Sequence, residues 1–233
     1  VLEAFRSGKT VDRLFVLDGC QDGPVKTILR EAKKQDTMVQ YVKKERLDQL
    51  SETKNHQGVI AYCAACEYAE VSDILENAKK KGEAPFIVLL DGIEDPHNLG
   101  AIIRTANQAG AHGVIIPKRR AVGLTATVAR TSAGAVNYTP VAKVTNLVTV
   151  MEDLKKEGMW FVCADMDGEE MYSLNLKGPI GLVIGNEGEG VSRLVKEHCD
   201  MVASIPMKGD IDSLNASVAM GVLAYEIVRQ RRF

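Results

Sequence analysis

The sequence predicts an α/β protein in two parts: a C-terminal, mainly parallel sheet with helices on both faces, and a small N-terminal α/β domain. Continuous apolar runs such as Phe86–Leu90 and Ile180–Ile184 alternate with helical patterns after residue 85. Parallel strands that are buried on both faces have this uninterrupted apolar character, because crossover helices cover each side of the sheet. Residues 68–84 are polar and punctuated by glycine, as linkers are, so we expect a domain boundary there.

The N-terminal part, residues 1–67, alternates short helices and strands. Its first residues fit the end of a helix that Gly8 terminates, since glycine is common just beyond helix ends. Apolar residues recur at helical spacing through Val25–Lys34, which predicts an amphipathic helix, and a short basic helix reaches Leu50. Basic residues are frequent but acids are interspersed, so charge alone slightly favours a solvated surface over RNA binding. The predicted strands are Arg13–Leu17, Met38–Val42 and Val59–Tyr62.

Residues 85–233 repeat the order strand, then helix. Each predicted strand is a short apolar run, and each predicted helix has its apolar residues at a period near 3.6. The predicted strands are Phe86–Leu90, Gly113–Ile116, Val141–Val144, Met159–Ala164, Ile180–Ile184 and Val202–Ile205. The predicted helices are Leu99–Ala109, Ala121–Ala133, Asn146–Glu157, the turn Ser192–Glu197 and a last helix running to about Arg229, besides a short one at Val71–Lys80 in the linker.

Composition restricts the class of protein. The chain has 233 residues, 45% of them hydrophobic and 26% charged, as expected for a globular protein of one large or two small domains. No apolar run approaches the roughly 20 residues that span a bilayer, and no signal peptide is visible, so we expect a cytoplasmic protein without membrane contact. The net charge of −2 gives no general signature of nucleic-acid binding.

The 5 cysteines are scattered and do not suggest a disulfide framework. Cys63 and Cys66 have metal-ligand spacing, but no second such pair or nearby pair of histidines completes a zinc site. We therefore expect small apolar side chains in a reducing compartment and no metal.

The first of three notable loops follows the strand Phe86–Leu90, at the end of a parallel sheet where ligands bind. It runs from Asp91 to the start of the next helix, where Asn98 could serve as the N-cap. Arg104 lies two positions beyond Ile102 and so points away from that core residue. A lone arginine in this place is most often an ordinary solvent-facing residue.

The second loop, Gly185–Gly190, has three glycines in six residues directly after a buried strand. Glycine lets a ligand approach the backbone closely. The acids Glu187 and Glu189 would repel a pyrophosphate, so the loop fits a neutral or cationic ligand better than a dinucleotide. Taken alone, it could also be no more than a turn.

The third loop lies within Ile205–Ser217. Pro206 ends the strand ladder because it has no N–H to donate. Ser213 could cap the last helix with its hydroxyl. The backbone of Ile205 and Met207, together with the apolar Leu214, would suit an adenine ring, which needs apolar contacts on its faces and hydrogen bonds at its edge.

Together, these loops resemble the three signature motifs of the SpoU (TrmH) branch of the SPOUT RNA methyltransferases. The motifs are Asp95–Ala106, Leu182–Gly190 and Ile205–Ala219, and the resemblance covers residues 85–233. Within this branch the chain is most similar to the RlmB-type enzymes, which are 23S rRNA guanosine 2′-O-methyltransferases. Residues 1–67 resemble, more loosely, the L30e-like RNA-binding domain of the family. The segments that carry the RlmB-type similarity are Pro117–Arg120, Thr131–Ala135, Val141–Leu147 and Arg193–Cys199.

The resemblance implies a deep C-terminal trefoil knot, a rare exception to the usual connection rules. It also implies a homodimer in which both subunits contribute to each active site. S-adenosylmethionine would be the cofactor, and 23S rRNA or a large-subunit precursor the RNA partner. The residues that the motifs place at the cofactor are Gly185, Asn186, Gly188, Ile205, Met207 and Leu214.

In the implied reaction, a ribose 2′-hydroxyl attacks the sulfonium methyl group, and catalysis needs positioning and proton removal. The family assigns the motif-one arginine, here Arg104, to that hydroxyl. Because a guanidinium remains protonated, we expect Arg104 to orient the phosphate and hydroxyl and to stabilise the alkoxide, while a phosphate takes the proton. The residues expected to align Arg104 and the ribose are Asn98, Glu187, Ser213 and Asn215.

Three other functions remain open from the sequence. One is a tRNA ribose methyltransferase or an antibiotic-resistance rRNA methyltransferase of the same family. Another is a non-catalytic RNA-binding or ribosome-assembly protein that keeps the fold, although all three motifs look intact. The last is a generic nucleotide-binding α/β enzyme, which would have affinity for phosphates instead.

Overall fold

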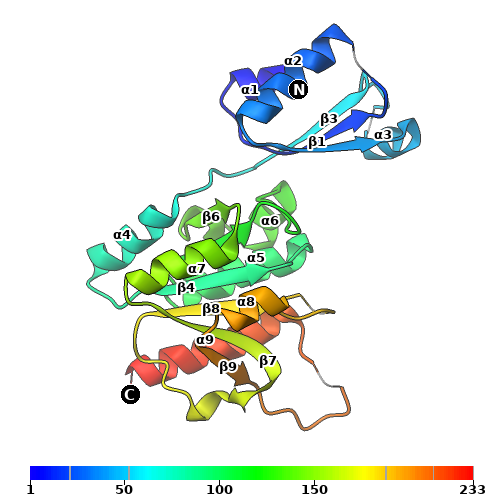
Figure 1. Cartoon of the computed structure of the whole chain (residues 1–233). Coiled ribbons are helices and arrows are strands. Elements are labelled where there is room, and N and C mark those ends of the chain that lie inside the picture. Colours follow the sequence, from blue (N-terminus) through cyan, green and yellow to red (C-terminus); the bar gives the residue numbers. More distant parts are fainter. Residues whose placement is uncertain (21, 52, 187, 212, 233) are drawn as a thin grey trace. The chain divides into compact units, whose positions relative to one another are not determined.

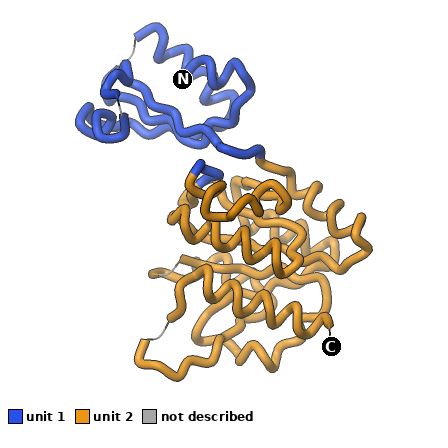
Figure 2. Tube along the Cα trace, turned by 180° about the vertical axis from the view of Figure 1, so that it is seen from behind, with its two compact units in different colours: residues 1–67, 123–126 blue, residues 68–122, 127–233 orange. Residues whose placement is uncertain are grey.

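The computed structural model of the chain divides into two compact units (Figure 2). The first contains residues 1–67 with 123–126, and the second contains residues 68–122 and 127–233. The residues that the structure describes are 1–20, 22–51, 53–186, 188–211 and 213–232.

The first unit is built on a three-stranded sheet of order β2-β1-β3. The central strand pairs parallel with β2 and antiparallel with β3. Apolar residues of the helices, including Phe5, Val25 and Ile28, pack with Leu14 and Val16 of β1 to form its core. The strands are β1 (Val11–Leu17), β2 (Met38–Val42) and β3 (Val59–Cys63), and the helices are α1 (Leu2–Arg6), α2 (Gly23–Lys34) and α3 (Lys44–Leu50).

The second unit is built on a six-stranded sheet of order β6-β5-β4-β8-β7-β9, in which every neighbouring pair of strands is parallel. Strand β8 lies between β4 and β7, which precede it in the chain, and β9 is added at the edge. This order is consistent with the expected trefoil knot, and the expected α/β fold class is confirmed. The strands are β4 (Phe86–Asp91), β5 (Gly113–Pro117), β6 (Val141–Val144), β7 (Trp160–Glu170), β8 (Ile180–Gly185) and β9 (Met201–Ser204).

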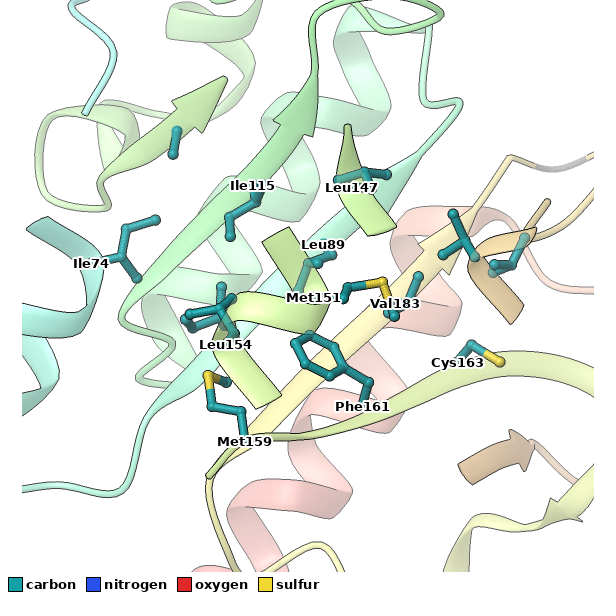
Figure 3. Packing of buried hydrophobic residues seen from close by; sticks show 14 residues of the cluster. Ile74, Leu89, Ile115, Leu147, Met151, Leu154, Met159, Phe161, Cys163 and Val183 are labelled. Atoms are coloured by element: carbon teal, nitrogen blue, oxygen red, sulfur yellow. The ribbon is translucent and has the colours of Figure 1, made fainter. Parts of the chain in front are cut away.

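Helices cover both faces of this sheet (Figure 1). Helices α4, α7 and α8 pack on one face, where Phe161 and Met151 lie within a large apolar cluster (Figure 3). Helices α5 and α9 pack against each other, and α9 also lies on β7 and β8. The helices are α4 (Val71–Lys81), α5 (Pro96–Gln108), α6 (Ala126–Thr131), α7 (Leu147–Lys156), α8 (Arg193–Glu197) and α9 (Ala216–Arg232), with 3-10 turns η1 (Ala135–Asn137) and η2 (Met171–Ser173).

Residues 68–84, expected as a linker, contain α4 and are grouped with the second unit. Ile74 of α4 is completely buried and belongs to the same apolar cluster as Phe161. The polar end of this helix stops at Gly82, whose φ of 66° is readily adopted by glycine. Helix α4 therefore helps to cover the large sheet.

Two predicted elements differ in length from the structure. The helix predicted over Ala121–Ala133 is confined to Ala126–Thr131, because the backbone N–H of Thr125 is bonded to the carbonyl of Gly123 instead of Ala121, and Ala133 has a left-handed φ of 50°. Strand β7 extends beyond the predicted Ala164, and its pairing with β9 shifts register before Glu169. Within the described residues, no helix has both the length and the apolar character needed to cross a membrane.

Candidate active site

The three loops meet at the carboxyl edge of the large sheet. Strands β4 and β8 are neighbours, and Asp91 stands opposite Gly185 at their ends. The carboxylate Oδ2 of Asp91 accepts a hydrogen bond from the backbone N–H of Ser192 at 2.8 Å. This bond fixes the end of β4 to Ser192, the residue just beyond the glycine-rich loop. No local sequence pattern indicates this link.

The first loop enters α5 through a cap at Asp95. Its side chain accepts from the backbone N–H groups of His97, at 3.2 Å, and Asn98, at 3.3 Å. Pro96 at the first helical position suits this arrangement, since it has no N–H that needs a partner. The suggestion that Asn98 is the N-cap is therefore wrong, and Asn98 lies within the first turn of the helix.

The second loop folds back tightly on itself. A side chain added at Gly185 would place its Cβ 2.0 Å from the carbonyl carbon of Gly190, so glycine is required there by close approach of the backbone. The Asn186 side chain stabilises the turn, because its Oδ1 accepts from the N–H groups of Gly188 and Glu189 at 2.9 and 2.7 Å. Asn186 therefore stabilises the conformation of the loop, in addition to lying within the candidate site.

The first and second loops contact each other closely at Gly92. Gly92 has a φ of 84°, and a Cβ at this position would lie 3.2 Å from Nδ2 of Asn186. The side chain of Asn186 therefore packs directly over the backbone of the first loop.

The third loop is joined to the first by two side-chain amides. Nδ2 of Asn215 donates to Oδ1 of Asn98 at 3.0 Å. Oδ1 of Asn215 accepts from the backbone N–H of Ser217, also at 3.0 Å, and so caps the start of α9. The predicted capping role of Ser213 is wrong, because the helix begins at Ala216 and Asn215 is the residue next to it.

The remaining predicted site residues lie around these joints. Ile205 and Leu214 are half-buried, whereas Met207 and Ser213 are exposed. Arg104 is exposed on α5, six residues beyond Asn98, which corresponds to about 9 Å along the helix axis. Glu187 lies outside the residues that the structure describes.

An ion pair next to the site was not expected from the sequence. Nζ of Lys196 in α8 lies 2.7 Å from Oδ2 of Asp165 in β7. The hydrogen bond to Asp165 raises the pKa of Lys196 above its usual value. Burial tends to raise the pKa of Asp165, but the bond from Lys196, the bond from the backbone N–H of Asp167 and the charge of Lys196 together outweigh it, so this pKa is lowered. Both groups are therefore charged at neutral pH, and the pair ties α8 to the strand beneath it.

The site is suited to holding a ligand and orienting a second one. It offers a close-packed glycine backbone, half-buried apolar side chains and amides, and a nearby arginine on α5. Across the described residues, no group of three or more His, Cys, Asp or Glu side chains could hold a metal ion. The fold and the site together define a ligand-binding α/β protein whose site lies at the carboxyl ends of parallel strands.

Comparison with known families gives this class a specific identity. The chain belongs to the SpoU rRNA methylase family, whose profile matches residues 85–225. Residues 1–69 match the RNA 2′-O ribose methyltransferase substrate-binding family. The protein is thus an RNA methyltransferase of the SpoU/TrmH group.

Relatives support this assignment over nearly the whole chain. YacO of Bacillus subtilis (strain 168), described as a TrmH family tRNA/rRNA methyltransferase, is 48% identical over 99% of this chain and 93% of its own. The SpoU methyltransferase AviRb from Streptomyces viridochromogenes, solved with AdoMet, is 27% identical with a TM-score of 0.65, covering 98% of this chain and 86% of its own. An AdoMet-bound rRNA methyltransferase from Sinorhizobium meliloti is 25% identical with a TM-score of 0.64, covering 98% and 83%.

Proposed function

We propose that the protein transfers a methyl group from S-adenosylmethionine to the 2′-hydroxyl of a guanosine ribose in the peptidyl-transferase loop of 23S rRNA. The observation that carries the proposal is the hydrogen bond between Asn98 and Asn215, which joins motif one to motif three beside the Gly185 loop. The guanosine and 23S rRNA assignments rest on the RlmB-type similarity of segments such as Pro117–Arg120.

S-adenosylmethionine fits the chemistry of the loops. Gly185 presents bare backbone where a Cβ has no room, and half-buried Ile205 and Leu214 provide apolar contact for an adenine ring. Gly188 and Met207 stand nearby on the same loops, and Asn186 holds the glycine-rich turn in shape. The two solved relatives described above contain AdoMet, which supports the same cofactor here. The bound cofactor would supply an electrophilic methyl group on its sulfonium.

The chain's own residues would orient the ribose hydroxyl and stabilise the alkoxide that forms from it. A guanidinium is a poor base but a good hydrogen-bond donor, so Arg104 would orient an RNA phosphate and stabilise the developing alkoxide. The hydroxyl proton would pass to a phosphate oxygen. Asn98, Ser213 and Asn215 would align the ribose, and Glu187 would orient Asn98 or Arg104.

We further propose a homodimer in which Arg104 acts in a site shared by two subunits. Arg104 is exposed and lies about two helical turns from Asn98. Helix α9, which packs beside α5, leaves Val218 and Tyr225 each 50% exposed. These two residues are seven positions apart and share one face of the helix. This apolar face, on the helix that packs beside the one carrying Arg104, would be covered by a second copy of the chain.

The two parts of the chain would have different functions. Residues 1–67 would bind the RNA, and their match to a substrate-binding family supports this role. Residues 85–233 would form the methyltransferase domain, and residues 68–84 would connect it to residues 1–67. A protein lacking residues 1–67 should therefore bind S-adenosylmethionine normally but bind RNA weakly.

The experiment is methyl transfer from labelled S-adenosylmethionine to unmodified 23S rRNA and, separately, to unmodified tRNA, followed by mapping of the methylated ribose. We expect label in one guanosine of the rRNA and its loss in Arg104→Ala, with cofactor binding intact by calorimetry. Label in tRNA alone would favour tRNA as the substrate, which is the other RNA named for relatives such as YacO. Cofactor binding without methylation of either RNA would favour a non-catalytic assembly protein.

A further inference from the structure

A hollow of about 200 Å³ lies at the same edge of the sheet, beside the glycine-rich loop. It is lined by the ends of β4 and β5, the loop that follows β5, and the beginnings of α7 and α8. Two arginines, Arg119 and Arg120, contribute to its walls, and Asp91 and Leu194 also line it. Drug-sized ligands occupy sites of roughly 300–1,000 Å³, so this hollow is matched to a smaller group.

The loop that carries both arginines is fixed at its two ends. The N–H of Lys118 donates to the carbonyl of Val144 at 2.7 Å, and the N–H of Val122 donates to that of Ile93 at 3.0 Å. Between them, Arg120 has a φ of 56°, in the left-handed region that is unfavourable for a long side chain. Backbone strain of this kind persists only where the surrounding structure enforces it, and it clusters at functional sites.

The charges around the hollow favour an anion. Among the described residues that line it, the one aspartate is Asp91, which already accepts the hydrogen bond from Ser192. Arg120 contacts Glu189 of the glycine-rich loop at 3.3 Å, with both side chains largely exposed. An exposed pair of this kind contributes at most about 1 kcal/mol. A phosphate could therefore replace Glu189, and two arginines can bind phosphate oxygens with paired hydrogen bonds.

We propose that Arg119, Arg120 and this hollow bind a backbone phosphate of the RNA next to the nucleotide that is methylated, an inference that rests on the proposed function. Asp91 at the hollow stands opposite Gly185 of the cofactor loop. The contact between Arg120 and Glu189 directly connects the hollow to the glycine-rich loop. Arrival of the phosphate would release Glu189 from Arg120, so RNA binding and the arrangement of the glycine-rich loop would be linked.

The test compares the full chain with Arg119→Ala/Arg120→Ala in binding a single-stranded RNA of mixed sequence at several salt concentrations. Each lost phosphate contact should make the negative slope of log K against log salt shallower by about 0.7. Binding of S-adenosylmethionine should remain unchanged, and the KM for substrate RNA should rise about tenfold with a smaller change in kcat. Lys156→Ala, at the far end of α7, is the matched control and should change none of these values.

The outcomes separate this inference from the proposed function. An unchanged salt slope and KM in the double variant would overturn the inference, even if the wild-type protein methylates RNA. A wild-type protein that shows the arginine-dependent slope but transfers no methyl group would overturn the proposed function instead. Inorganic phosphate that binds at micromolar concentration through the same arginines, with no effect on the RNA slope, would identify a site for free phosphate. Arg120→Gly removes the strained φ with the side chain, so it provides a second test if the double variant folds poorly.

Discussion

The amide of Asn215 donates to Oδ1 of Asn98 at 3.0 Å, across 117 positions of sequence. The other end of the same amide accepts from the backbone N–H of Ser217 and caps α9. One side chain therefore both starts the last helix and holds motif three against motif one. These two roles can be separated by substitution.

Asn215→Ser should keep the helix cap but lose the bond to Asn98, because serine caps well and is too short to reach across. We expect stability to urea to change by less than about 0.5 kcal/mol and methyl transfer to fall about 2- to 10-fold, as for one lost hydrogen bond. Asn215→Ala should lose the same activity and a further ~1 kcal/mol of stability. Equal stability of the two variants would contradict the capping role.

Gly185→Ala should abolish cofactor binding, because the added Cβ would lie 2.0 Å from the carbonyl carbon of Gly190. Relief of that overlap requires the loop to open, at a cost of about 1–3 kcal/mol. Calorimetric titration with S-adenosylmethionine and thermal unfolding would measure both effects. The matched control is Gly178→Ala, since a Cβ there has no atom within 4 Å. Normal cofactor binding by Gly185→Ala would show that the loop does not form the cofactor site.

His112 should make stability depend on pH. It is completely buried, its Nδ1 accepts from the N–H of Phe86, and its Nε2 lies 3.1 Å from Glu83. Burial lowers its pKa below the ordinary 6.5, against the opposing effect of the Glu83 bond. A histidine with a lowered pKa gains a proton on unfolding, so the free energy of unfolding should fall as pH drops below about 6.5 and level off below the folded-state pKa.

Urea unfolding between pH 8 and pH 5 would measure that fall. His112→Asn keeps an acceptor near the position of Nδ1 but does not titrate in this range. The variant should be less stable at pH 8 and should lose less stability on acidification than the wild type. An identical pH dependence in both proteins would assign the effect to other groups.

Arg231 holds α9 against the beginnings of two strands. Its guanidinium donates to the carbonyls of Ala84, Pro85 and Gly178 at 3.0, 3.0 and 2.7 Å. Arg231→Lys loses the planar fork that reaches three acceptors, so we expect at least about 2 kcal/mol of destabilisation in thermal or urea unfolding. Arg232→Lys, on the exposed neighbouring residue, should be neutral.

Much of the fold follows from local sequence patterns. The apolar runs at Phe86–Leu90 and Ile180–Ile184 lie within β4 and β8, because a strand covered on both faces must be apolar throughout. The order of strands could not be read this way, since placing β8 between β4 and β7 depends on contacts between distant segments. The same limit applies to Ala121–Ala133, where the N–H of Thr125 bonds to the carbonyl of Gly123 and the helix begins only at Ala126.

The loops of the site were also visible in the sequence, but their internal contacts were not. Glycine spacing marks Gly185–Gly190 as a place of close backbone approach. Choosing between Ser213 and Asn215 as the cap requires the first helical residue, and sequence patterns locate helix ends poorly. The Arg120–Glu189 contact joins residues 69 positions apart and carries no local signal.

The distance along the chain between Asn98 and Asn215 also determines when the site can form during folding. Closing a flexible loop of 117 residues costs about 4 kcal/mol of chain entropy, from the logarithmic dependence on loop length. Contacts of such long range form slowly compared with helices and hairpins. In a refolding experiment, helical content should therefore recover before the capacity to bind S-adenosylmethionine, and the active site should be among the last parts of the molecule to mature.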